Sequence, residues 1–331
     1  MIVSAQLSRQ QDALWVARRG RTPRLLYQGT GALLVNDVSR DGRVLVTERD
    51  WRQELALFHP GDHDATPLDW FDWALVSGLS DDGTGILSYE GGVAVGGQGE
   101  ILLSNLARPT PTSLGPGAAL DLSPDGKWVA AVRVEAPTKL WLLPTGPGMA
   151  RSVDVPGLDR FTGAAFFLDG KRLALLAQAG GLPRPRLYVL DLDGPTLRPI
   201  SPPLGVDTVV AVSPDEKWIA ATGDDGIITA YPVEGGEPTR ATEYGPAHRL
   251  VGWLKDGSLL AFNRYALPTP VRRLDSRSRA ISLFTTLTPA DRTGVPDIIR
   301  VRVTPDGHTF AFHYRRMSET LYVLDWGGSP P

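Results

Sequence analysis

One short turn motif recurs along the whole chain and sets the repeat of its architecture. Its fullest copy is Ser123-Pro124-Asp125-Gly126, which stands between an alternating apolar segment, 119–122, and an apolar run, 128–132. Proline presets φ at the second turn position, Asp bonds the local backbone, and Gly takes the left-handed conformation that ends such a hairpin turn. Each copy therefore predicts two antiparallel strands joined by a tight turn. The seven turn aspartates are Asp41, Asp82, Asp125, Asp169, Asp215, Asp256 and Asp306.

The spacing of these aspartates, 41 to 50 residues, is that of one four-stranded propeller blade. A third apolar strand follows in most units, for example at 187–191 and 321–325, and no stretch shows a convincing helical period. We therefore predict a single all-β domain over residues 1–331, a β-propeller of seven blades, each a four-stranded antiparallel sheet. Residues 1–31 would form a partial leading blade. Two other counts stay open, eight blades with one incomplete, or six.

Two details of the motif give expectations that a structure can check. The fifth copy ends in Glu216 where the other copies have Gly, so a shared turn geometry requires Glu216 to adopt a positive φ. The carboxylates of the seven turns are interpreted as structural, because Asp is a common turn residue. Trp128 and Trp218 directly follow two of the turns and are expected in the core.

Composition excludes several classes of protein. The chain has no cysteine, so disulfides, thiolate zinc sites and cysteine nucleophiles are ruled out. With a net charge of −3 it lacks the strongly basic character of a nucleic-acid binder. It contains no apolar run of about 18 residues, and its first residues do not resemble a signal peptide. We expect a cytoplasmic location, with neither a nucleic acid nor a membrane as partner.

The turn motifs also carry a resemblance to known proteins. They resemble TolB-like, WD-repeat-related propeller repeats, and more closely the propeller regions C-terminal to serine/threonine kinases of acidobacteria and myxobacteria. The segments that carry the closer resemblance are 69–73, 142–146, 231–238, 287–291 and 314–322. The chain departs from such kinases because it has neither a His-Arg-Asp catalytic loop nor an Asp-Phe-Gly motif. The resemblance implies a ligand- or protein-binding sensor attached to a kinase domain in cis, and it brings no catalytic residues.

Catalytic motifs are absent from the sequence. Gly-x-Ser-x-Gly, the P-loop and the dinucleotide-binding fingerprint do not occur. His59 and His63 flank Pro-Gly-Asp in the one metal-like cluster, which we interpret as a solvated hairpin loop. We predict no catalytic residue, no metal and no cofactor. Two alternatives stay open, a metal-dependent, lactonase-like propeller hydrolase and the gating propeller of a peptidase that lacks its catalytic domain.

Binding residues are expected at one mouth of the central channel. Propellers bind through loops between strands, and the loops after the second strand and before the first strand meet at the same mouth. These loops are rich in Arg, Trp and Tyr, the residue types that dominate binding hot spots. The candidates for contact with a protein or small-molecule ligand are Arg49, Trp51, Trp73, Arg133, Arg160, Arg264, Tyr265, Tyr314 and Arg315.

Overall fold

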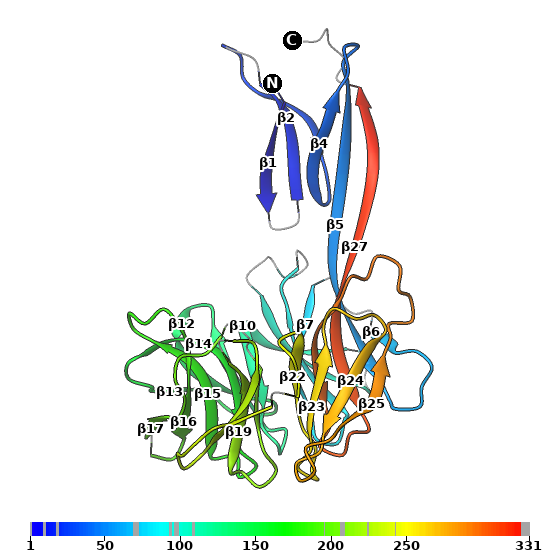
Figure 1. Cartoon of the computed structure of the whole chain (residues 1–331). Coiled ribbons are helices and arrows are strands. Elements are labelled where there is room, and N and C mark those ends of the chain that lie inside the picture. The colour runs from blue at the N-terminus through cyan, green and yellow to red at the C-terminus, as the bar shows by residue number, and fades with distance from the viewer. Residues whose placement is uncertain are drawn as a thin grey trace.

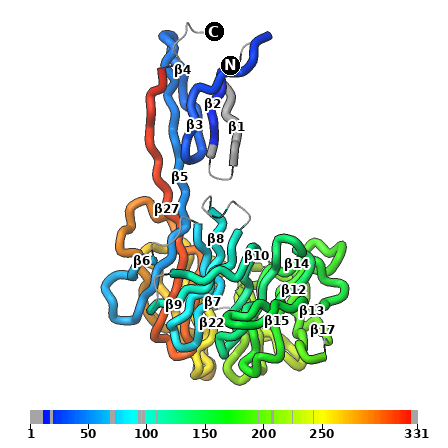
Figure 2. Tube along the Cα trace, turned by 180° about the vertical axis from the view of Figure 1, so that it is seen from behind, coloured from blue at the N-terminus to red at the C-terminus, as the bar shows by residue number. Residues whose placement is uncertain are grey.

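The protein is all-β, and its described strands pair in antiparallel fashion. The computed structural model describes residues 2–8, 11–17, 20–68, 73–92, 95, 99–107, 110–194, 196–205, 209–223, 225–241 and 243–325. These residues form 27 strands, arranged as a ring of radial sheets with an arm that stands clear of it (Figures 1 and 2).

The first three blades of the ring follow each other along the chain. Blade 1 consists of β7 (Ala74–Leu79), β8 (Gly85–Glu90), β9 (Glu100–Asn105) and the first half of β10 (Thr112–Leu122). Blade 2 takes the second half of β10 and adds β11 (Trp128–Arg133), β12 (Ala136–Pro144) and β13 (Arg151–Val153). Blade 3 consists of β14 (Leu158–Phe166), β15 (Arg172–Ala179), β16 (Arg186–Asp191) and β17 (Leu197–Pro199).

The last three blades complete the ring. Blade 4 consists of β18 (Val210–Val212), β19 (Trp218–Thr222), β20 (Ile228–Pro232) and β21 (Thr239–Arg240). Blade 5 consists of β22 (His248–Trp253), β23 (Leu259–Asn263), β24 (Thr269–Leu274) and β25 (Ile281–Leu287). Blade 6 combines both ends of the chain, because β26 (Ile298–Val303) and the first half of β27 (Phe310–Asp325) pair with the second half of β5 (Arg43–Phe58) and with β6 (Thr66–Leu68).

The core confirms that these six blades close on each other. Six separate apolar clusters each bridge two consecutive blades, and the last of them joins blade 6 to blade 1 through residues such as Ala311 and Val76. The first strands of blades 6 and 1, β26 and β7, are in direct contact. The six blades therefore form a closed ring by packing, with the first strands β7, β14, β18, β22 and β26 at the ends of their sheets.

The arm contains the remaining strands. Here β1 (Ile2–Ser8), β2 (Gln11–Val16) and β3 (Arg24–Gln28) form a three-stranded sheet, and β4 (Ala32–Val38) pairs with the first half of β5. β5 and β27 pair along their entire 16-residue length, from Phe310 opposite Phe58 to Asp325 opposite Arg43, so they run from the ring into the arm without a break. A seventh apolar cluster, which includes Leu14, fills the space between the two sheets of the arm.

The predicted all-β propeller is confirmed, and a strand pair flanks each of the seven turn aspartates. Six of these seven units form the closed ring, which is the lower of the alternative counts. The seventh, around Asp41, belongs to the arm together with the sheet of residues 2–28. The repeat number is therefore consistent with seven, while the ring itself has six blades.

The turns have the common geometry that the sequence predicts. The Gly126 N–H donates to the carbonyl of Ser123 at 2.8 Å, and the Glu216 N–H donates to the carbonyl of Ser213 at 2.9 Å. Gly126 has a φ of 69° and Glu216 a φ of 57°, so the fifth turn does hold a non-glycine residue in the left-handed region. Asp125 accepts hydrogen bonds from the Ser123 hydroxyl and the Lys127 N–H, and these bonds lower the pKa of its carboxyl. The turn carboxylates are thus occupied by their own turns.

Candidate functional site

The two faces of the ring differ in what they display. The Asp turns join the first and second strands of each blade at one face, which we call the turn face. β27 leaves the ring after Tyr314, at the strand end opposite the Asp306 turn, so the arm rises from the other face, which we call the arm face (Figure 1). The sequence placed the predicted binding residues in loops, but only Trp73, Arg264 and Tyr265 lie outside the strands, because β5 and β27 continue through the predicted loop positions into the arm.

A buried carboxylate gathers three of the predicted residues where the arm meets the ring. Asp297, 5% exposed, accepts two hydrogen bonds from the Arg315 guanidinium at 2.8 and 2.5 Å. Arg264 donates to the same carboxylate at 3.0 Å, and the Arg315 guanidinium lies 5.7 Å from the centre of the Trp51 ring. Burial of Asp297 opposes its ionisation, but the bonds from Arg315 and Arg264 outweigh that effect and hold its pKa below the usual value. One cluster therefore contains Trp51, Arg264 and Arg315, held together by the ion pairs to Asp297 and by the contact of Arg315 with the Trp51 ring.

The other predicted residues lie apart from this cluster. Arg49 sits in the arm and pairs with Glu319 at 2.6 Å, whereas Arg133 in blade 2 pairs with Glu135 at 2.6 Å. Arg160 is exposed on blade 3. The backbone of Trp73 makes an isolated bridge to Gln53 of β5.

The two tyrosines of the prediction differ in exposure. Tyr265 is 71% exposed beside Arg264 and is presented to solvent. Tyr314 is 2% exposed and belongs to the core between blades 5 and 6. Its ring therefore faces the protein interior, because alternate residues of a strand point to opposite faces and Tyr314 falls on the inner one.

The sequence analysis did not identify the acidic residues Asp297 and Glu54, which bind arginines at the base of the arm. Asp297 lies in the loop between β25 and β26, and Glu54, which binds the Arg316 guanidinium at 2.7 and 3.0 Å, lies within β5. The only signal in the sequence was the excess of arginine in these loops, since buried arginines require acidic partners.

The arm displays an apolar strip and an unpaired strand edge. Leu34 and Leu321 both pair with Thr47 and so lie on the same outward face of the arm sheet, where they are 58% and 62% exposed. Val323, two residues further along β27, shares this face and is also 62% exposed. Beyond Met317, no described residue pairs with the other edge of β27. Such an edge and apolar strip are typical of strand-addition interfaces.

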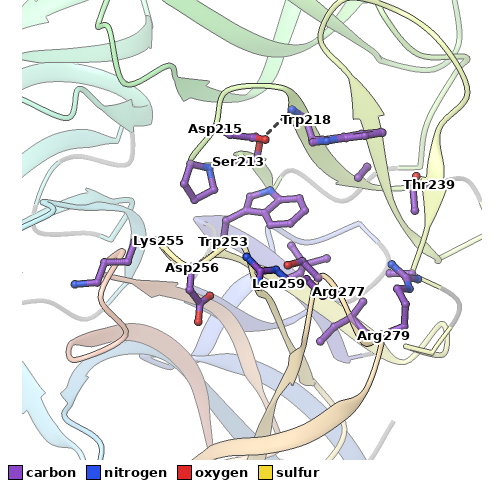
Figure 3. Close-up of a pocket in the computed structure, with 16 residues that line it drawn as sticks. Ser213, Asp215, Trp218, Thr239, Trp253, Lys255, Asp256, Leu259, Arg277 and Arg279 are labelled. Atoms are coloured by element: carbon purple, nitrogen blue, oxygen red, sulfur yellow. Dashed lines mark hydrogen bonds between the residues drawn. The ribbon is translucent and has the colours of Figure 1, made fainter.

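A pocket of about 460 Å³ opens on the turn face between blades 4 and 5 (Figure 3). We call it the turn pocket. Trp218, at the start of β19, and Trp253, at the end of β22, form part of its wall. Both Trp128 and Trp218 were expected in the core, but they are only partly buried, because the first residue of a second strand reaches the turn face, where neighbouring blades diverge. Lys255, Asp256, Arg277 and Arg279 add charge to the rim.

No three His, Asp or Glu side chains among the described residues gather in a way that could hold a metal ion. In the 59–64 loop, His59 lies 3.3 Å from Asp62 and His63 lies 2.7 Å from Asp64, each as a separate exposed pair. Within the described ranges there is also no helix long and apolar enough to cross a membrane.

Known structures share the fold. No protein-family profile and no curated protein matches the sequence. The putative TolB from Agrobacterium tumefaciens superposes with a TM-score of 0.58 at 19% identity, covering 81% of this chain and 99% of that one. A chain of a nidogen/laminin complex gives a TM-score of 0.56 at 12% identity, covering 76% of this chain and 97% of that one. TolB from Acinetobacter baumannii gives 0.47 at 16% identity, and the match spans 69% of this chain and 61% of that TolB. At these identities the first two matches establish the fold alone, a β-propeller.

Proposed function

We propose that this chain is a non-catalytic, cytoplasmic propeller that senses a ligand or binds a protein, and that it forms the C-terminal sensor part of a bacterial serine/threonine kinase. The observation that carries the binding role is the arm, which holds an apolar strip and a free strand edge away from the ring. Support for the kinase comes from the resemblance of segments such as 69–73 and 314–322. In this proposal the arm contacts the kinase domain and the arm face of the ring receives the ligand.

The base of the arm supports a role in transmitting a signal. Arg315 and Arg316 follow each other on β27, and both are tied by bidentate contacts, to Asp297 and to Glu54. The Met317 N–H donates to the carbonyl of Gly294 at 2.8 Å, which adds a backbone hydrogen bond between β27 and the loop that precedes β26. Charged hydrogen bonds of this geometry are among the strongest in proteins. A movement of the arm that a partner causes would therefore be transmitted to blade 6.

The coding sequence upstream of Met1 gives the first test, since a kinase domain in the same reading frame is expected there. Hydrogen exchange then compares that whole protein with the present chain. We expect slower exchange at 318–325 in the whole protein and loss of this protection in Leu321→Glu/Val323→Glu. Leu283→Glu changes a similarly exposed apolar residue of the ring, 60% exposed, and serves as the control. Equal exchange in the two proteins would refute docking on the arm, and an unrelated upstream sequence would refute the kinase context.

A further inference from the structure

The turn pocket combines flat apolar walls with the size of a small-molecule site. Its volume of about 460 Å³ falls in the range of pockets that hold drug-sized ligands. Leu259 and Leu274 line it beside the two indoles of Trp218 and Trp253. The Trp253 indole N–H donates to the carbonyl of Ala211 at 3.3 Å, so this ring is held in place and presents its apolar surface to the pocket.

The acidic groups of the pocket are engaged by neighbouring residues. Asp215 accepts hydrogen bonds from the Ser213 hydroxyl and the Lys217 N–H, at 2.7 and 3.2 Å. Asp256 accepts the Ser258 N–H at 2.8 Å and pairs with Arg273 at 2.5 Å. Asp256 is therefore neutralised by Arg273, whereas Asp215 is bonded to uncharged donors and keeps its negative charge.

Two cations of the pocket have no such partner. Within the described part of the chain, the side chains of Lys255 and Arg277 make no ion pair within 4 Å and no hydrogen bond, although Lys255 interacts electrostatically with Asp306 at longer range. The third cation, Arg279, is bound to Glu243 by two contacts of 2.9 and 2.7 Å. The lining carries three cations, Lys255, Arg277 and Arg279, against the two carboxylates Asp215 and Asp256, so the pocket keeps one net positive charge beside two indoles.

The loop that carries Arg277 is held in a fixed conformation. Asp275 accepts hydrogen bonds from the N–H groups of Arg277 and Ser278 and from the Ser278 hydroxyl. Arg279 has a φ of 61°, a conformation that side chains rarely adopt, and its bidentate contact with Glu243 of the preceding blade holds it there. Strain that surrounding contacts maintain is a recurrent feature of binding sites. Because the loop is already ordered, a ligand that binds here would not incur the entropic cost of ordering it.

We propose that the turn pocket binds a small organic anion with a flat apolar body, such as an aromatic carboxylate. The aromatic part stacks against Trp218 and Trp253, and the anionic group meets Arg277 and Lys255. Such a ligand uses both features of the pocket, whereas an inorganic anion leaves the indoles uncovered and a neutral aromatic leaves the cations unpaired. The site lies on the face opposite to the arm, so the proposal is independent of the proposed kinase context.

The test titrates the protein with 2-naphthoate and follows ligand NMR signals. We expect one site with a Kd on the order of 0.1–1 mM, as suits a ligand of this size. Two matched probes separate the contributions: 2-naphthylmethanol keeps the rings without the charge, and acetate keeps the charge without the rings. Each is expected to bind at least about tenfold more weakly than naphthoate.

Variants locate the site. Arg277→Gln/Lys255→Gln should weaken naphthoate binding by about tenfold or more. Lys171→Gln/Arg198→Gln removes the same charge from exposed positions of blade 3 and should leave Kd unchanged. The proposal is overturned if the wild type does not bind naphthoate, if the two double variants lose affinity equally, or if 2-naphthylmethanol binds as well. Binding of hexaglutamate without binding of naphthoate would assign the pocket to an acidic peptide and would also overturn it.

Discussion

Glu216 tests how the repeat tolerates a departure from its own motif. Glu216→Gly removes a side chain from a residue with a φ of 57°, which relieves strain of about 1 kcal/mol. The same change frees the unfolded chain and costs about 0.5–1 kcal/mol. These two effects nearly cancel, so the backbone alone predicts almost no change in stability.

The side chain of Glu216 decides the result. Its carboxylate lies 2.5 Å from the Arg172 guanidinium and accepts the Asp169 N–H at 3.2 Å, so it joins blade 4 to blade 3. The two side chains are 24% and 29% exposed, and a pair in this setting contributes about 1 kcal/mol, between the values for exposed and for buried charged bonds. We therefore expect Glu216→Gly to lower the free energy of unfolding by about 1 kcal/mol. For a chain of this length that is a fall of about 1–2 °C in Tm if the ring melts as one unit.

Scanning calorimetry on a double-mutant cycle with Arg172→Leu separates the two contributions. In the Arg172→Leu background, Glu216→Gly loses no ion pair but still loses the bond from the Asp169 N–H, so it should lower Tm by less than in the wild type. Gly126→Glu, at the matching position of blade 2 where φ is 69°, adds strain without relief and should destabilise by about 1 kcal/mol. An equal effect of Glu216→Gly in both backgrounds would refute the role of the ion pair, and a stabilising effect in the wild type would refute the whole account.

Three further variants have expected outcomes. His313 is buried and accepts the Val76 N–H at 3.2 Å. Burial and nearby arginines hold its pKa well below the usual value, so the free energy of unfolding should fall as the pH drops through about 6.5. His313→Gln should reduce this pH dependence, as measured by urea titrations. Burial raises the pKa of Asp121 from 3.8 to about 6, so stability falls as the pH rises between these values and the loss is complete above about 6. Asp121→Asn should therefore stabilise by about 1–2 kcal/mol at pH 7 and not at pH 4, while the Phe166 N–H keeps an acceptor; equal effects at both pH values would contradict this. Asp297→Asn should destabilise by about 2–3 kcal/mol because it leaves two arginines short of their partner, and equal hydrogen exchange in the arm of this variant and the wild type would count against it.

The local part of the fold was predictable because it depends on contacts within a few residues. The Ser-Pro-Asp-Gly motif determines its own hydrogen bonds, and these bonds place Glu216 in the left-handed region even without glycine. The strand pair on each side of a turn follows directly, since a tight turn brings the two strands side by side in antiparallel orientation.

The division between ring and arm was not predictable in the same way. The sequence predicts loops around Arg49 and Arg315 and a separate third strand at 321–325, whereas residues 43–58 and 310–325 each form one continuous strand that runs from the ring into the arm. Their pairing joins positions more than 250 residues apart, such as Arg49 and Glu319. The blade count depends on that long-range pairing, because it places the Asp41 unit in the arm.

The candidate sites show the same limit. Arg264 and Arg315 were identified because the sequence shows arginines just after the predicted second strands, although Arg315 lies within β27 and not in a loop. The turn pocket takes three residues from each of three turns in blades 4 and 5, and the repeat pattern treats the two Asp turns among them as equivalent. What distinguishes them is the lack of a partner for Lys255 and Arg277, which only the folded arrangement reveals.

The paired strands β5 and β27 connect the arm to the apolar core that lies next to the turn pocket. The first half of β27 contributes Phe310 and Phe312 to the core between blades 5 and 6, and that core also contains Leu254, the residue before Lys255 of the pocket. A partner on the arm and a ligand in the pocket therefore act on the same packed cluster from opposite faces. If either one shifts that cluster, the two affinities must change by the same factor, because coupling between binding sites is reciprocal. Titration of naphthoate with and without a bound arm partner measures this factor directly, and identical Kd values would show that the core of blades 5 and 6 does not transmit between them.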